Sequence, residues 1–121
     1  MNSITGDKSF DFAVRIVNLY RYLCSSKKEF VLSNQLLRSG TSIGANVREA
    51  LQGHSKRDFL AKISIALKEA YESQYWIELL AATDYLNEEQ KESLWADCDE
   101  LIRLLVAITK TTKENLINES K

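Results

Sequence analysis

Apolar side chains recur along most of this chain at intervals of three and four residues, which is the period of an α-helix with one buried face. No proline interrupts these runs. The pattern predicts helices at about 7–26, 33–52, 56–82 and 88–116, joined by short polar connections. We therefore expect an all-α protein, with residues 1–121 forming a single domain. Its expected architecture is an antiparallel, up-down-up-down four-helix bundle.

Polar residues at the ends of these segments support the boundaries. The candidate N-caps are Asp7, Ser33 or Asn34, Ser55 with Asp58, and Asn87 with Gln90. Gly53 is placed to end the second helix, and the residues after about Leu116 are expected to fray.

A line of polar residues runs beside the apolar stripe of the second predicted helix, and a second polar line is expected on the third. The residues of both lines are Arg38, Ser42, Asn46 and Glu49, then Glu69 and Glu72 next to Trp76. If the lines meet, Arg38 can bind a carboxylate in a bidentate pair, and Asn46 can bridge polar groups. The first interpretation is a structural polar network that fixes helix register. The alternatives are a ligand or polyanion site around Arg38 and Arg48, and a subunit contact.

Small residues occupy about one turn of the same helix, at Gly40, Ser42, Gly44 and Ala45. A glycine inside a helix costs roughly 1 kcal/mol relative to alanine. We therefore expect another backbone to approach closely at this turn.

The net charge of -1 hides an asymmetry along the chain. Residues 1–68 hold 11 basic and 5 acidic side chains, whereas residues 69–121 hold 5 basic and 12 acidic ones. This split favours either a basic face for polyanions or two complementary faces that meet between subunits, although charges simply mixed over the surface would give it too.

Residue types that carry catalysis or bind metals are scarce. The one histidine, His54, belongs to no Glu-x-x-His unit, and Cys24 and Cys98 form no C-x-x-C pair. We expect no enzyme activity, no cofactor and no metal site. There is no secretion signal and no apolar run of about 20 residues, so we expect a cytoplasmic protein that does not enter a membrane.

Three segments carry a resemblance to a known family. RSGTSIGANVREA (38–50), SKRDF (55–59) and IALKEAYESQYWIELL (65–80) resemble the bacterial four helix bundle proteins, which were first named from reading frames in intervening sequences of large-subunit ribosomal RNA genes. The resemblance extends from about Phe12 to Ile108. Many members read Ala-Glu-Gly where this chain has Arg48-Glu49-Ala50, so the glycine at the helix end is moved or lost here.

The resemblance implies a homopentameric ring of four-helix subunits. A relative, the accessory protein of diversity-generating retroelements, is basic, binds nucleic acid and assists a reverse transcriptase. By analogy, the partners here would be RNA or DNA and a protein such as a reverse transcriptase. Phosphate contacts need basic residues gathered in one place, and the candidates at the junction of the second and third helices are Arg38, Arg48, Lys56, Arg57 and Lys62.

Two functional hypotheses follow. In the first, the protein is a non-enzymatic, ring-forming accessory protein that binds nucleic acid through the basic junction. In the alternative, it is a protein-protein adaptor or scaffold without nucleic-acid binding, and the basic residues are used between subunits. Trp76 and Trp95 are candidate interface anchors, because tryptophan is enriched at the centres of protein interfaces.

Overall fold

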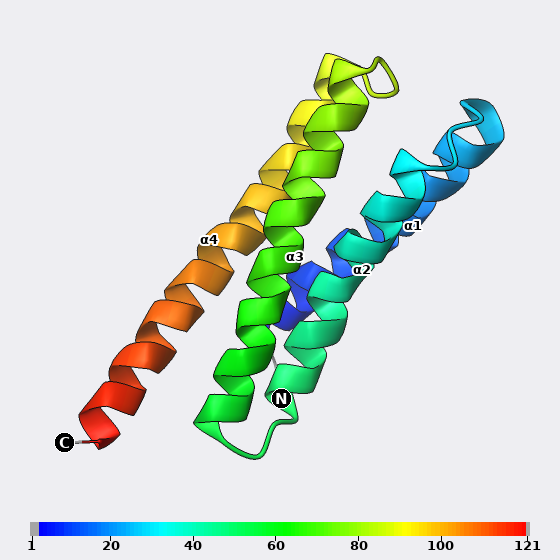
Figure 1. The fold of residues 1–121 in the computed structure, drawn as a ribbon. Helices are drawn as coiled ribbons and strands as arrows, with labels where there is room; N and C mark the ends of the chain where they lie inside the picture. The colour runs from blue at the N-terminus through cyan, green and yellow to red at the C-terminus, as the bar shows by residue number, and fades with distance from the viewer. Residues whose placement is uncertain (1–2, 121) are drawn as a thin grey trace.

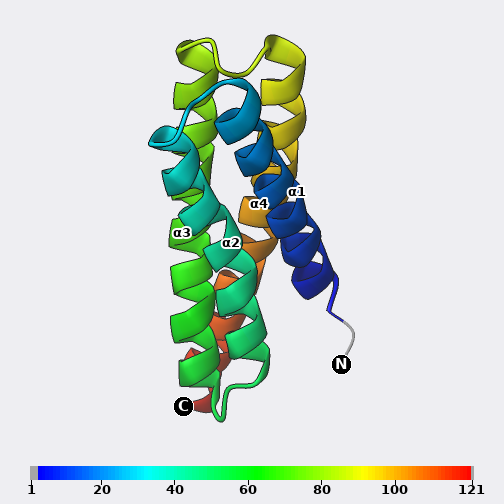
Figure 2. The same ribbon diagram turned by 90° about the vertical axis from the view of Figure 1, so that its right-hand side faces the viewer.

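The computed structural model describes residues 3–120 and contains four helices within them. These are α1 (Ile4–Ser26), α2 (Leu32–Leu51), α3 (Lys56–Ala82) and α4 (Glu88–Glu119). Each helix packs against the next one along the chain, and α1 also touches α4 (Figures 1 and 2). The prediction of an antiparallel, all-α four-helix bundle is confirmed.

The start of α1 differs from the prediction. The hydroxyl of Ser3 accepts a hydrogen bond from the Gly6 N–H at 2.9 Å, so Ser3 is the N-cap. Asp7 lies inside the first turn, where its carboxylate interacts favourably with the helix dipole.

The end of α4 also differs, because the helix continues through Glu119 instead of fraying after Leu116. Thr112 is buried, and Lys56 at the start of α3 forms an ion pair with Glu119. The last turns of α4 therefore remain in contact with the rest of the bundle.

The start of α2 is capped by a residue that the sequence pattern did not indicate. Ser33 and Asn34 lie inside the helix, so neither is the N-cap. The buried carboxylate of Glu29 instead accepts hydrogen bonds from the N–H groups of Val31 at 3.0 Å, of Leu32, and of Ser33 at 3.2 Å. The chain enters this turn through Lys28, whose φ of 55° is unusual for a residue with a side chain.

The starts of α3 and α4 are capped as predicted. The Ser55 hydroxyl accepts a hydrogen bond from the Asp58 N–H at 3.1 Å. Asn87 and Gln90 form a complete capping box, in which each side chain accepts a hydrogen bond from the other residue's backbone N–H, at 2.8 and 2.9 Å.

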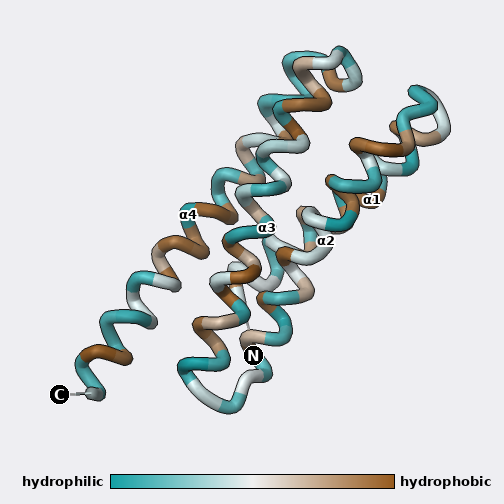
Figure 3. Tube along the Cα trace, viewed as in Figure 1, coloured by the Kyte–Doolittle hydropathy of each residue, from teal (hydrophilic) through white to brown (hydrophobic). Residues whose placement is uncertain are grey.

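Small residues let α1 and α2 approach each other closely. A Cβ atom added at Gly40 would lie 2.9 Å from Cγ1 of the buried Ile16, and one added at Gly44 would lie 3.2 Å from the carbonyl oxygen of Ser9. Figure 3 shows that hydrophobic positions recur along every helix, as the periodicity predicts.

The contact between α1 and α4 covers only part of their length. It includes ion pairs of Lys8 with Glu100 at 3.0 Å and of Arg15 with Asp97 at 2.7 Å. Beyond these pairs, the N-terminal end of α1 diverges from the C-terminal half of α4 (Figure 2). None of the helices in residues 3–120 combines the length and the hydropathy that a membrane span requires.

Candidate functional site

The polar residues predicted on α2 and α3 meet at Arg38. Its guanidinium lies 3.1 Å from Glu69 and also forms an ion pair with Glu72. Glu69 is buried, and Glu72 accepts a hydrogen bond from the indole N–H of Trp76 at 3.1 Å. One arginine therefore binds two carboxylates that lie three residues apart on α3, which ties the register of the two helices together.

The other polar residues in the line on α2 make two kinds of contact. The Ser42 hydroxyl donates to the carbonyl of Arg38 at 2.7 Å, and the Asn46 amide donates to the carbonyl of Ser42 at 2.8 Å, so both stay within their own helix. Glu49 reaches α3 and pairs with Lys62 at 2.9 Å. The cross-helix contacts of this line are therefore made at its two ends.

Most of the basic residues at the α2–α3 junction already have a carboxylate partner. Lys56 pairs with Glu119, Lys62 with Glu49, and Arg38 with two glutamates. In residues 3–120, Arg57 has no carboxylate within 4.0 Å. An exposed ion pair contributes only about 0–1 kcal/mol to stability, but it does reduce the positive potential that a phosphate would meet.

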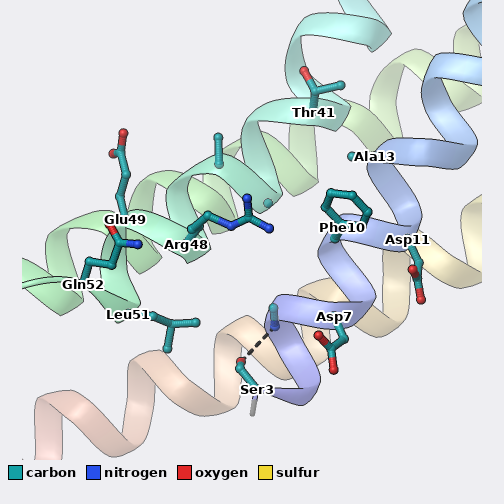
Figure 4. A pocket seen from close by; sticks show the side chains of 13 residues that line it. Ser3, Asp7, Phe10, Asp11, Ala13, Thr41, Arg48, Glu49, Leu51 and Gln52 are labelled. Carbon is teal, nitrogen blue, oxygen red and sulfur yellow. Dashed lines mark hydrogen bonds between the residues drawn. The ribbon is translucent and has the colours of Figure 1, made fainter. Parts of the chain in front are cut away.

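Arg48, the fifth residue of this set, lies on another side of α2. Its guanidinium carbon is 5.7 Å from the centre of the Phe10 ring, which is within the range of a cation–π contact. The two side chains meet across an open groove of about 920 Å³ between α1 and α2 (Figure 4). Asp7 and Asp11 also line the groove, and Gly44 and Ala45 contribute small residues to its lining.

The sequence pattern did not indicate this groove. Phe10 lies outside the buried stripe of α1, and its side chain is 52% exposed. A possible signal is that Phe10 and Val14 are four residues apart and hence share a second, outward face of the helix.

Both tryptophans lie at the edge of the core. Trp76 and Trp95 are partly buried and pack against the buried cluster. The indole N–H of Trp95 is buried and has no hydrogen-bond partner among residues 3–120. Their role as interface anchors stays a prediction.

The residues considered for metal binding or nucleophilic chemistry are dispersed. His54 is exposed in the turn before α3. The buried Cys98 thiol donates to the carbonyl of Ala70 at 3.2 Å, and burial, with smaller contributions from Asp99 and Asp97, raises its pKa to about 12. No three His, Cys, Asp or Glu residues gather into a metal-binding group within the part of the chain that the structure describes.

Comparison with known proteins identifies similar sequences and folds. The family model of the 23S rRNA-intervening sequence protein matches residues 2–107. A similar solved structure is the crystal structure of a protein with unknown function from the S23 ribosomal protein family of Bacteroides thetaiotaomicron. The two chains are 57% identical with a TM-score of 0.87, and the match covers 88% of this chain and 99% of the other. No curated protein matches this chain.

Proposed function

Because the chain belongs to the 23S rRNA-intervening sequence protein family, and a solved relative is a protein with unknown function, we propose a role from the surface of this chain: a non-enzymatic, ring-forming scaffold that binds other proteins. The homopentamer implied by the sequence resemblance is the ring size we propose. Nucleic-acid binding through the basic junction is the competing hypothesis.

The observation that carries the proposal is the pairing of charge within the subunit. Basic residues from the first part of the chain pair with acidic residues from the second part at Lys8–Glu100, Arg15–Asp97, Arg38–Glu69 and Lys56–Glu119. The basic first part and the acidic second part of the chain therefore partly neutralise each other within one subunit. A phosphate backbone would have to displace glutamates to reach Arg38, Lys56 or Lys62.

Exposed apolar side chains support the same proposal. They occur on α1, in the α1–α2 loop and on α3, and include Phe10, Val14, Phe30, Val31, Ile65, Tyr71 and Tyr75. Aromatic residues are enriched in protein–protein interfaces, whereas nucleic-acid affinity depends mainly on unpaired cations. The exposed apolar surface therefore has the features of a protein-binding module.

The experiment that separates the two hypotheses is fluorescence anisotropy of labelled single-stranded and duplex RNA and DNA with the full chain, at about 50 and 200 mM salt. The double variant Arg57→Glu/Lys62→Glu tests the junction. Arg21→Glu/Lys91→Glu, in α1 and α4 and away from the junction, makes the same change in net charge and is the matched control. Circular dichroism checks that both variants fold.

We expect no saturable binding by any of the three proteins. Binding that weakens steeply with salt, is lost in the junction variant and is kept in the control would replace the scaffold by a nucleic-acid-binding accessory protein. Binding that survives in both variants would also contradict the proposal, and would move the nucleic-acid site away from the junction.

A further inference from the structure

One outward face of α1 combines apolar side chains with unpaired acids. Asp7, Phe10, Asp11 and Val14 have the spacing of neighbours on a helix surface. Phe10 and Val14 are both about half exposed. Neither aspartate has a cation within 4.0 Å among residues 3–120. We refer to these four residues as the acidic α1 face.

The acidic α1 face borders the groove between α1 and α2. Phe10 and Arg48 stand on opposite sides of this groove, with Thr41 and Ala13 further along it (Figure 4). Ala45 contributes only a methyl group to its lining, whereas Gly44 lies where α2 meets Ser9 of α1. Its volume of about 920 Å³ is large enough to take several side chains from another helix.

The C-terminal half of α4 carries a face with the opposite charge. Val106, Lys110, Lys113 and Ile117 follow one another at intervals of four, three and four residues, so they lie along one side of the helix. Val106 is 42% exposed and Ile117 is 58% exposed. In the described part of the chain, neither lysine has a carboxylate within 4.0 Å. We refer to these four residues as the basic α4 face.

We propose that the basic α4 face of one copy packs against the acidic α1 face and the adjoining groove of a second copy. Lys110 and Lys113 would pair with Asp7 and Asp11, while the apolar residues of the two faces cover each other. In both ribbon views the C-terminal end of α4 lies apart from the N-terminal end of α1, so one subunit does not close this contact on itself (Figures 1 and 2).

Charge complementarity favours this occupant over the other exposed apolar surfaces of the chain. The surface around Tyr71 and Tyr75 on α3 carries one cation, Lys68, and one carboxylate, Glu78, so its net charge is zero. The basic α4 face has two lysines beside one carboxylate, Glu114, and keeps a positive charge to match the aspartates. The proposed contact joins two different surfaces and is therefore heterologous, which builds a ring when the rotation closes. The inference rests on the proposed self-assembly and specifies the surfaces that meet.

Light scattering coupled to size-exclusion chromatography of the full chain tests the contact. Three variants are compared with wild type: Lys110→Glu/Lys113→Glu, Asp7→Lys/Asp11→Lys, and all four changes together. Arg21→Glu/Lys91→Glu is the matched control for a loss of positive charge elsewhere. We expect each double variant to lower the molar mass towards the 13.8 kDa subunit, and the combined variant to restore the wild-type mass.

The outcomes distinguish this inference from the proposed function. A monomeric wild type refutes self-assembly and the contact together. A wild type that assembles, with both charge-reversed variants keeping its mass, refutes the contact alone. Failure of the combined variant to recover, while circular dichroism shows that it is folded, refutes the pairing of these charges. Should the Asp7 change unfold α1, Ile117→Ser provides a second test, because this exposed residue contributes little to the core and its loss is expected to lower the assembled mass.

Discussion

Removal of the Glu29 carboxylate is expected to destabilise the bundle more than the loss of an ordinary helix cap. The carboxylate is buried and accepts the N–H groups of Val31, Leu32 and Ser33, which begin the helix that carries Arg38. Glu29→Ala leaves all three donors without this partner. Val31 is 73% exposed, so water lies close to the backbone there, whereas Ser33 is 1% exposed and water cannot replace the lost bond.

The magnitude follows from these contacts. Loss of a helix N-cap costs about 0.5–2 kcal/mol, and a buried donor left without a partner adds about 1–3 kcal/mol. We therefore expect Glu29→Ala to lower the free energy of unfolding by roughly 2–4 kcal/mol, which is a large part of the ~5–15 kcal/mol that stabilises a typical domain. At about 4 °C per kcal/mol, the melting temperature should fall by roughly 8–16 °C.

Urea unfolding followed by circular dichroism measures this loss. Asn87→Ala is the matched control, because it removes a cap at the exposed start of α4 and should cost only about 1 kcal/mol. Both variants should keep the wild-type dependence on urea concentration, since the surface exposed on unfolding is unchanged. A loss for Glu29→Ala that is equal to or smaller than the loss for Asn87→Ala would refute the reasoning.

Three further predictions concern the core and the Arg38 cluster. A double-mutant cycle with Arg38→Met and Glu72→Gln should show coupling of about 0.5–1.5 kcal/mol in urea unfolding, and additive losses would remove the ion pair as a link between α2 and α3. Gly40→Ala should lower stability by about 1–2 kcal/mol through its clash with Ile16, and the effect should shrink in an Ile16→Ala background; equal effects in both backgrounds would contradict the close approach. The pKa of Cys98 is raised to about 12 in the folded state, so the neutral thiol should stabilise the fold fully below about pH 9 and progressively less as the pH rises from there towards 12. The urea midpoint should decline over this range. A Cys98→Ala variant with the same decline would assign it to other groups.

Two helix caps with a standard spacing could be predicted from the sequence, whereas a cap in an unusual turn and contacts between distant residues could not. The caps at Ser55 and Asn87 involve partners three residues away, so their spacing identified them. The cap at Glu29 requires a carboxylate to be buried in a folded turn, and the last turns of α4 meet Lys56, which is 63 residues away in the sequence. Neither arrangement produces a pattern of residues at the three- or four-residue spacing of a helix.

The candidate site shows the same division. The line of polar residues on α2 indicated that Arg38 could reach the glutamates of α3, because helical spacing fixes which residues share a face. Spacing does not show how two helices are rotated against each other, so the pairing of Lys62 with Glu49 and the position of Arg48 over Phe10 needed the structure.

The molar mass of the full wild-type chain in solution tests the central claim most directly. Size-exclusion chromatography with light scattering is run over a dilution series from about 100 to 1 µM, at low and at near-physiological salt. A scaffold that assembles into a ring predicts one discrete species at a multiple of 13.8 kDa, with five subunits as the proposed number, at the higher concentrations. A single species of 13.8 kDa at every concentration would contradict the account.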